Sequence, residues 1–412
     1  MNTVVHHPDS VYAHILGGQS LVAGQPISNV VPLKDGSAIG IGHDRGNGYG
    51  KHASILHGKL VTQEMVNAIA NTTKTIAGAK ATTYRLQRAG EYGLPFCIGD
   101  DALKTNTSQP LPTGSTGRRL SDVRQIEYEM AAMVAFLRKC GYPSGRHTIT
   151  LSIAIPNDEI VLTNTTGRTA VIAETEKALR EVYEKTWTIE ETNPRGEVHE
   201  WELGFTKKRV VIPQTMGAIT LYSRDMYGRS ILDGTEAIAI VDIGHGDTQG
   251  SIVQLKPFSM SVERIGDGTI RIAKALLPAM RQQAMNDGSI DATQINMNQA
   301  QAIAQTKTVI KRGKTVRIEG LVDEVTTREA ASLAVELARF FRATNGEPII
   351  VGGGSKNQLI RETIEKQTKS LWGDGQGVFF FDPKLTSVAN AIGAFMQLFW
   401  VAQAQAATKA QA

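Results

Sequence analysis

Residues 38–51, AIGIGHDRGNGYGK, run from an apolar segment into a glycine-rich turn. We expect residues 38–43 to form a strand, residues 44–51 to form the turn, and residues 54–61 to supply the hairpin partner. The same pattern returns in residues 237–249, AIAIVDIGHGDTQ, and a third glycine turn, GGGS at 352–355, follows the apolar residues 348–351. Any one of these turns is typical of an ordinary hairpin or strand-to-helix connection. It is their recurrence after buried strands, twice with an Asp at the strand end, that points to a shared chemistry.

The chemistry that such turns favour is the binding of nucleotide phosphates. Glycines let backbone N–H groups approach phosphate oxygens closely, and successive N–H groups form an anion-binding nest. A phosphate tail also needs Mg²⁺, which keeps most of its waters and is held through one or two carboxylates. Asp44 and Asp242 are therefore candidate Mg²⁺ ligands, partly through water, and Lys51 is a candidate point charge for the phosphates. The plainer alternatives are turn-forming aspartates and a solvent-facing lysine.

Three better-known glycine motifs fit less well. A Walker A loop reads GxxxxGK[ST], and the segment from Gly46 to Lys51 is one residue short and lacks the hydroxyl. A dinucleotide fingerprint opens a helix, whereas the residues after Lys51 have the pattern of a strand. A calcium loop needs oxygen ligands at regular positions, and Arg45, Gly48 and Gly50 do not supply them.

Composition places the chain among ordinary globular proteins. It has 412 residues, of which 41% are apolar and 20% charged, and a length that favours two domains. The net charge of +4 is too small to indicate nucleic-acid binding. Cys97 and Cys140 form no CxxC pair, and no run approaches the roughly 18 apolar residues that span a bilayer. The first residues do not resemble a signal peptide, so we expect a cytoplasmic protein.

Further elements follow from periodicity. Residues 1–36 show no sustained pattern, and we expect an N-terminal extension that is dispensable for folding. Ser121 is the expected cap of a helix with one buried stripe, and Thr326 and Glu329 form an expected capping box. We also expect strands at 148–155, 209–212 and 378–381, a mostly helical stretch at 265–345, and a final helix capped by Thr386 or Ser387.

Taken in order, these motifs resemble the ParM/StbA family of bacterial actin-like plasmid segregation ATPases, within the actin, sugar-kinase and heat-shock ATPase superfamily. DRGNGYGK resembles the first phosphate loop, VDIGHGDTQ the second, and IIVGGGS the adenosine motif. TLSIAIP resembles the strand that crosses into the second domain, and VVIPQTMGAI a segment that follows it. RIGDGTI and TSVANAIGAF resemble a Gly/Asp turn and the closing helix, so the likeness runs from about residue 38 to 400.

The resemblance implies an α/β, actin-like fold of two lobes, each a mixed sheet flanked by helices, around a nucleotide cleft. It implies an extension at 1–36, domain I at 37–156, domain II at 157–384, and a C-terminal helix at 385–412 that returns to domain I and ends in a tail. The implied cofactors are ATP or ADP and Mg²⁺, with Gln214 and Asp242 as catalytic residues and Asp44 and Asp242 at the metal. The implied cofactor-binding residues are Asp44, Gly46, Asn47, Gly48, Tyr49, Lys51, Gly244, Gly246, Asp247, Thr248, Gly266, Asp267, Gly352, Gly353, Gly354 and Ser355.

The resemblance also implies a function. Family members polymerise head to tail with ATP into filaments that hydrolysis destabilises, and the filaments move plasmids through a DNA-bound adaptor protein. Direct contact with DNA and a membrane anchor are not expected. Gln214 stands where the family usually has Glu, and a Gln orients water but cannot abstract a proton. His245 and Gln249 also depart from the pattern. The alternatives are a small-molecule kinase of the same superfamily and a non-hydrolysing actin-like adaptor.

Overall fold

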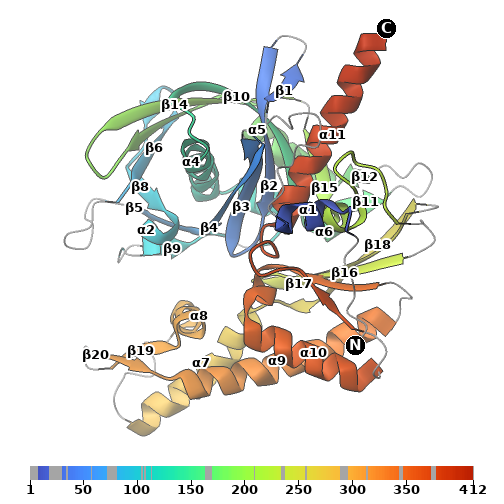
Figure 1. The fold of residues 1–412 in the computed structure, drawn as a ribbon. Coiled ribbons are helices and arrows are strands. Elements are labelled where there is room, and N and C mark those ends of the chain that lie inside the picture. Colours follow the sequence, from blue (N-terminus) through green and yellow to red (C-terminus); the bar gives the residue numbers. More distant parts are fainter. Residues whose placement is uncertain are drawn as a thin grey trace. The chain divides into compact units, whose positions relative to one another are not determined.

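The computed structural model describes the chain in two compact units, which are taken one at a time below (Figure 1). The larger unit comprises His6–Thr235, Leu255–Met260 and Val388–Ala412, and the smaller unit comprises Met1–Val5, Glu236–Gln254 and Ser261–Ser387. The described residues are 8–17, 30–33, 36–56, 58–71, 81–103, 105, 108–112, 114–162, 169–207, 209–232, 237–255, 258–287, 296–311, 314–342, 347–372 and 377–411.

A long, curved mixed sheet forms the frame of the larger unit. Its central strand, β10 (Gly145–Ile155), runs parallel to β2 (Gly36–Arg45) on one side and to β14 (Val198–Phe205) and β15 (Val210–Pro213) on the other. Beyond β2 lie β3 (Tyr49–Leu56) and β4 (Lys59–Val66), with β1 (Val30–Leu33) also paired to β2. Beyond β14 the order is β13 (Trp187–Thr192), β6 (Thr83–Arg88), β8 (Phe96–Ile98), β5 (Ala68–Asn71) and β9 (Ser108–Pro110), and β7 (Glu91–Tyr92) pairs with β6.

The core of this unit lies between the curved sheet and helix α4 (Val123–Lys139). Figure 1 shows α4 on the concave side of the sheet, and its residues Met130–Leu137 are buried almost without interruption. This segment of the helix is therefore apolar on every side, as a helix segment enclosed by its own domain must be. Shorter elements complete the unit: α2 (Gly99–Leu103), α3 (Thr116–Leu120), α5 (Ala173–Tyr183), a 3₁₀ turn at Asn157–Glu159, and the small hairpin β11 (Ile160–Leu162) and β12 (Thr169–Val171).

Three glycines allow the C-terminal helix to lie directly on the backbone of its neighbours. Helix α11 (Ala389–Gln411) packs on β2 and on α6 (Gln214–Ser223). A Cβ atom on Gly42 would lie 2.0 Å from the carbonyl oxygen of Ala391, and one on Gly393 would lie 1.9 Å from that of Gly217. No side chain fits at these distances. The glycines therefore let α11 pack closely on both β2 and α6, and this holds α6, including its first residue, in place beside the sheet.

The smaller unit has a five-stranded mixed sheet. Its order is β18 (Phe258–Asp267), β17 (Asp247–Leu255), β16 (Ala237–Ile243), β21 (Glu347–Val351) and β22 (Phe379–Phe380), with β16 parallel to β21. Helices α7 (Ile270–Asp287), α9 (Glu319–Arg342) and α10 (Gln358–Trp372) cover one face of it in Figure 1. Leu276, Leu333, Leu337 and Ile364 on these helices meet Val241 and Ile350 in the core. Helix α8 (Met297–Thr306) and the hairpin β19 (Thr308–Lys311) and β20 (Lys314–Arg317) complete the unit.

This architecture confirms the expected fold class, since each unit is a mixed sheet flanked by helices. Three local expectations are wrong. Helix α4 is capped by Asp122, whose carboxylate accepts from two backbone N–H groups, and not by Ser121. Residues 54–61 span two strands, because the chain turns at Gly58, where φ is +74°. Thr326 and Glu329 lie inside α9, which begins at Glu319, so they form no capping box.

The division into units differs from the predicted domains, most clearly in two segments. We placed the start of domain II at residue 157, but β10 continues to pair with β15, and residues up to Thr235 belong to the larger unit. Within the predicted extension, helix α1 (Val11–Leu16) packs on α6, with Val11 fully buried and its N–H donating to the carbonyl of Arg224 at 2.9 Å. This part of the N-terminal segment is therefore core structure, contrary to our expectation that it is dispensable. Residues 1–7, 18–29 and 34–35 lie outside the described part.

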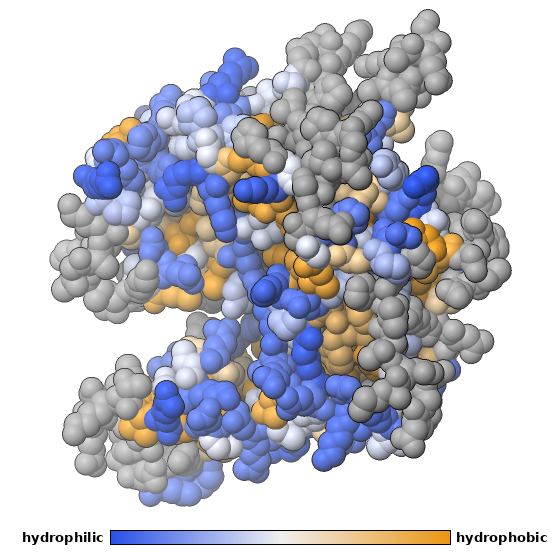
Figure 2. Space-filling model, in the orientation of Figure 1, coloured by the Kyte–Doolittle hydropathy of each residue, from blue (hydrophilic) through white to orange (hydrophobic). Residues whose placement is uncertain are grey.

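None of the helices among the described residues is both long and apolar enough to cross a bilayer. On the face drawn in Figure 2, hydrophilic residues predominate among those coloured, and apolar residues gather only in smaller groups.

Candidate functional site

The first glycine turn carries a buried ion pair. Asp44 lies at the carboxyl end of β2, directly opposite Lys51 on β3 in the antiparallel register. The Nζ atom of Lys51 lies 3.0 Å from Oδ2 of Asp44, and the two residues are 5% and 0% exposed. The second carboxylate oxygen, Oδ1, has no hydrogen-bond partner among the described residues. A buried carboxylate oxygen without a donor is costly, so this atom is poised for a further ligand.

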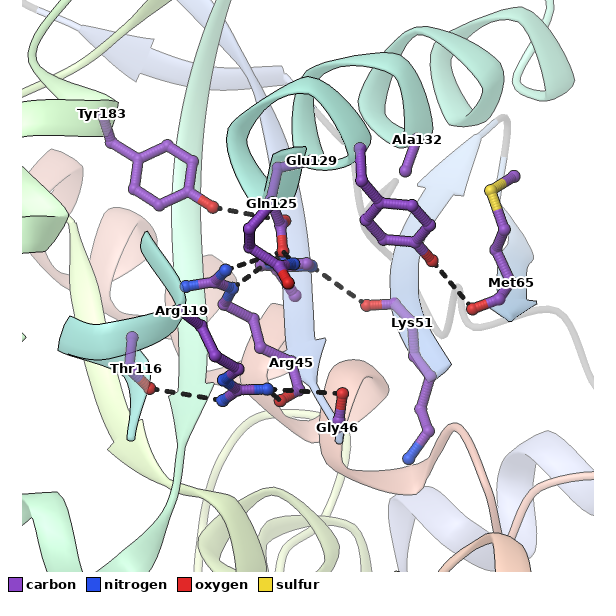
Figure 3. Close-up of polar contacts among 12 residues, drawn as sticks. Arg45, Gly46, Lys51, Met65, Thr116, Arg119, Gln125, Glu129, Ala132 and Tyr183 are labelled. Carbon is purple, nitrogen blue, oxygen red and sulfur yellow. Dashed lines mark hydrogen bonds and ion pairs between the residues drawn. The ribbon is translucent and has the colours of Figure 1, made fainter. Parts of the chain in front are cut away.

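Behind this turn lies a buried polar group that we call the Glu129 cluster: His43, Arg45, Gln125, Glu129 and Tyr183. Figure 3 labels the last four of these residues. Nε and Nη2 of Arg45 donate to Oε1 of Glu129 at 3.0 and 2.8 Å, and Gln125 donates to the same oxygen at 2.8 Å. His43 Nε2 lies 2.9 Å from Oε2. Burial alone would raise the pKa of Glu129, but the charges of Arg45 and His43 and their hydrogen bonds hold it well below its usual range. The carboxylate is thus fixed as an anion that anchors the end of β2.

A second histidine extends this cluster into the core. The ring of His52 stacks on that of His43 with centroids 4.6 Å apart and on Phe136 at 5.4 Å. Burial, and then the neighbouring His43, hold the pKa of His52 well below its usual value. His52 is therefore a neutral, apolar-like packing element at neutral pH.

Gln214 lies at the same edge of the sheet as Asp44. Strands β2, β10 and β15 are parallel, with Asp44 opposite Ala154 and Ile155 opposite Pro213, so their carboxyl ends meet at one edge. Gln214 is the first residue of α6, directly after Pro213, and is 8% exposed. The larger unit thus brings the Asp44 turn and Gln214 to a common edge.

In the smaller unit, the second glycine turn meets the Gly/Asp turn at the end of β18. The N–H of Gly244 donates to the carbonyl of Asp247 at 2.9 Å, which closes the turn. The hydroxyl of Thr248 donates to the carbonyl of Asp267 at 3.1 Å. A Cβ atom on Gly268 would lie 2.2 Å from the carbonyl oxygen of Gly244, so the two turns touch backbone to backbone.

The third glycine turn closes against Asp242. Strands β16 and β21 are parallel, with Asp242 opposite Val351, so Gly352 follows at the same sheet edge. Gly352 has φ +99°, and a Cβ atom on it would lie 2.1 Å from Oδ1 of Asp242. On its other side the N–H of Gly352 donates to the carbonyl of Thr386 at 3.0 Å. Glycine is required here by both its conformation and its surroundings.

The smaller unit therefore brings most of its predicted site residues together, with Gly354 packed against Ile243 and Thr269. Ser355 is bound to Thr386, with its Oγ 2.7 Å from Oγ1 of that threonine. The sequence patterns missed Thr386 as part of the site, because its position before a helix indicated a cap.

Asp267 has a role different from that of Asp242. Its carboxylate pairs with Lys274 and lies 3.6 Å from Arg264, and the hydrogen bond from Lys274 lowers the pKa of Asp267. Gly266, beside it, lies against Glu336 and Arg271. The side chain of Asp267 thus serves an ion pair, and its backbone carbonyl contacts the second turn.

The residues present fit a phosphate-bound magnesium ion better than a metal held by protein alone. Among the described residues, no group of three or more His, Cys, Asp or Glu side chains is arranged to hold a metal. Mg²⁺ bound to phosphate needs only one or two carboxylates, because water and phosphate oxygens supply the rest. The Oδ1 atom of Asp44 is buried and accepts no hydrogen bond from the part of the chain that the structure describes, which suits that requirement.

Comparison with known proteins extends these observations. No protein-family model matches the sequence, and no curated protein matches it. The structure resembles an archaeal actin homolog, Ta0583, with a TM-score of 0.58 and 20% identity over 87% of this chain and 98% of that one. It also resembles the ParM of Bacillus thuringiensis with AMPPNP, with a TM-score of 0.57 and 14% identity over 88% and 98% of the two chains.

The apo pSK41 ParM protein gives the same result, with a TM-score of 0.57 and 14% identity over 89% of this chain and 98% of that one. Identities this low say nothing about individual residues, but the near-complete coverage of each neighbour leaves no major part of its fold unmatched. The chain therefore has an actin-like fold, similar to that of ParM proteins and of an archaeal actin homolog.

Proposed function

We propose that this protein is an actin-like ATPase that binds ATP with Mg²⁺. One observation in the smaller unit carries the proposal. The second glycine turn, the Gly/Asp turn at the end of β18 and the third glycine turn come together beside the buried carboxylate of Asp242. Backbone N–H groups of such turns bind phosphate oxygens. The likeness to Bacillus thuringiensis ParM, solved with ATP and with AMPPNP, supports the choice of nucleotide.

The proposed roles follow from the chemistry of each side chain. Glycines at 46, 48, 244 and 246 let the backbone approach the phosphates, and Lys51 adds a positive charge. Asp44 and Asp242 would hold Mg²⁺, in part through water, and the ion would neutralise part of the phosphate charge. Gly352–Ser355 lie beside the adenosine, as the family resemblance implies.

Gln214 is the residue that we propose for hydrolysis. Its amide has both a donor and an acceptor and can orient an attacking water, but it cannot take up the proton. Its place at the start of α6, which the glycine contacts of α11 fix against the sheet, suits a positioning task. We therefore propose slow hydrolysis that depends on this amide.

We further propose that the protein polymerises head to tail and acts in the cytoplasm in plasmid segregation, with a DNA-bound adaptor as partner. Contacts between unlike surfaces of identical subunits propagate as a helical filament unless the rotation closes a ring. The support is the similarity of the fold to ParM proteins and the family motifs of the sequence.

The test combines binding, turnover and assembly. Purified protein is titrated with a fluorescent ATP analogue, assayed for phosphate release, and pelleted with ATP, ADP or a slowly hydrolysed analogue over a range of protein concentrations. We expect Mg²⁺-dependent binding and slow hydrolysis. With ATP, protein should pellet above a critical concentration, and the amount of pelleted protein should fall as ADP accumulates. Monomers at every concentration that phosphorylate a small molecule would support a kinase instead. Nucleotide binding and assembly without turnover would indicate a non-hydrolysing adaptor.

A further inference from the structure

Two side chains outside the glycine motifs hold the carbonyl groups of the first glycine turn. Nη1 of Arg119 donates to the carbonyl of Arg45 at 2.6 Å and also lies 3.4 Å from that of Gly46 (Figure 3). Nδ2 of Asn67 donates to the carbonyl of Gly46 at 2.7 Å, and the N–H of Asn67 donates to the carbonyl of Gly48 at 2.9 Å. The turn is thus bound by donors at three of its carbonyls.

Because the peptide bond is planar, a donor that fixes a carbonyl group also fixes the orientation of the N–H group that follows it. In a trans peptide, the carbonyl of one residue and the N–H of the next point in opposite directions. Donors at the carbonyls of Arg45 and Gly46 therefore turn the N–H groups of Gly46 and Asn47 away from Arg119 and Asn67. Lys51 lies close to the same turn, since a Cβ atom on Gly46 would be 3.6 Å from its Nζ. The turn thus combines directed N–H groups with a nearby positive charge.

Arg119 is itself held rigidly. It lies on the short helix α3 and is 1% exposed, with Nη2 3.5 Å from the hydroxyl of Thr116. The N–H of Thr116 donates to Oε1 of the buried Glu159 at 2.5 Å, and Oε2 of Glu159 accepts from Thr175 on α5 at 2.7 Å. A guanidinium fixed in this way acts as a preformed donor, and little side-chain entropy is lost when it binds the turn.

The smaller unit also restrains carbonyls of its glycine turn, but it does so with main-chain donors. At the second glycine turn, the carbonyl of Gly244 accepts from the N–H of Thr269 at 3.0 Å, and that of His245 accepts from the N–H of Ile270 at 2.8 Å. Gly244 corresponds to Gly46, because each is the second residue after the strand-end aspartate. Restraint of the turn carbonyls is therefore common to both turns, although its chemical source differs.

We propose that Arg119 and Asn67 are positioning residues for phosphate binding: they hold the carbonyls of the first glycine turn so that its N–H groups face a phosphate. The proposal rests on the proposed ATP-binding function. Neither residue touches the phosphate; both act through the backbone of residues 45–48.

The experiment compares Arg119→Met and Asn67→Leu, which keep side-chain size but remove the donors. Arg118→Met is the matched control, because Arg118 is the exposed neighbour on the same helix. For each protein, a bound fluorescent ATP analogue is displaced by ATP, by inorganic tripolyphosphate or by adenosine. The midpoint of thermal unfolding is measured without ligand. We expect Arg119→Met and Asn67→Leu to bind ATP and tripolyphosphate about tenfold or more weakly, since hydrogen bonds to charged groups are lost or misdirected. The affinity of these two variants for adenosine should be unchanged, and Arg118→Met should bind all three ligands like the unmodified protein.

The outcomes separate this proposal from the proposed function. If the unmodified protein does not bind ATP, the proposed function fails. If it binds ATP and both variants match it, or if the variants lose ATP and adenosine equally, the positioning role is wrong. Arg119→Lys keeps the charge and a donor and should recover part of the affinity, which a purely structural role does not predict. Should Arg119→Met fail to fold, Asn67→Leu and Arg119→Lys decide the question.

Discussion

The Asp44 turn and the Asp242 turn are built on the same backbone plan. Each begins at an aspartate on the carboxyl end of a buried strand, passes through glycines, and returns in an antiparallel strand. Each aspartate also has a parallel neighbour strand on its other side, at Ala154 for Asp44 and at Val351 for Asp242.

The two turns differ in the residue opposite the aspartate. Lys51 stands opposite Asp44 and forms a buried ion pair with it, whereas Gln249 stands opposite Asp242 and donates to Oδ2 of Asp247 at 2.7 Å. The first turn therefore contains its own cation, and the second presents two carboxylates beside a neutral amide. One backbone frame thus supports two different charge arrangements.

The largest expected effect comes from making the first turn like the second with Lys51→Gln. This change leaves the fully buried Asp44 without its cation, and loss of one partner of a buried pair costs about 3–5 kcal/mol. Denaturant unfolding should show this loss, while Asp44→Asn combined with Lys51→Gln should recover much of it. The reverse change, Gln249→Lys, should cost far less. An unaltered unfolding midpoint for Lys51→Gln would show that the ion pair does not stabilise the turn.

The second prediction tests both aspartates as metal ligands. Asp242→Asn and Asp44→Asn each remove a charge directed at Mg²⁺, and ATP hydrolysis should fall by roughly a hundredfold, about 2.7 kcal/mol. Asp267→Asn is the comparison, because that carboxylate is paired with Lys274 and should matter much less. Phosphate release is measured over a range of Mg²⁺ concentrations. If Asp242→Asn and Asp44→Asn both hydrolyse ATP at the rate of the unmodified protein, neither aspartate is a metal ligand of the site.

The third prediction concerns the glycine that closes against Asp242. Gly352→Ala forces a Cβ atom into a space 2.1 Å from Oδ1 of Asp242 at a φ of +99°, and we expect a loss of about 1–3 kcal/mol in unfolding free energy. Gly353→Ala is a matched control, since a Cβ atom there meets nothing within 4 Å. Equal stability of the two variants, by thermal or chemical denaturation, would contradict the close packing of the third turn.

The fourth prediction separates hydrolysis from binding. Gln214 lies at the sheet edge of the Asp44 turn, so Gln214→Ala should slow phosphate release by roughly tenfold, about 1.4 kcal/mol, with nucleotide affinity almost unchanged. Filaments should then persist longer after ATP is added, as followed by light scattering. A variant that loses affinity and keeps its turnover number would assign Gln214 to binding.

The smallest effect is a pH dependence of stability that His52 gives to the first turn. His52 has a folded-state pKa well below 6.5, so below pH 6.5 the unfolded chain binds a proton that the folded chain excludes. Stability should therefore be full above pH 6.5 and fall by on the order of 1 kcal/mol toward pH 5.5. Amide exchange, corrected for its intrinsic pH dependence, should show this in β2 and β3. Burial also lowers the pKa of His245, so β16 and β17 should show a separate dependence of the same sign. His52→Phe should remove the trend in β2 and β3, and its persistence in that variant would exclude His52 as the cause.

The sequence by itself identified the two strand–turn–strand units, the third glycine turn and the fold class. These features are local: apolar runs, a strand-end aspartate and glycines depend on residues a few positions apart, and their backbone conformations follow from those residues. The strand before Gln214 was found for the same reason.

Features that rest on distant contacts came only from the tertiary structure. Arg119 lies 74 residues from the carbonyl it holds, and Glu129 lies 84 residues from Arg45, so no spacing in the sequence reveals either contact. The unit boundary was misplaced because Pro156 ends β10 locally, while the pairing of β10 with β15 keeps the chain in the same unit. Helix α1 has too little apolar periodicity to stand out, and Val11 is core only because α6 packs against it. Local patterns set the turns, and long-range packing sets what restrains them.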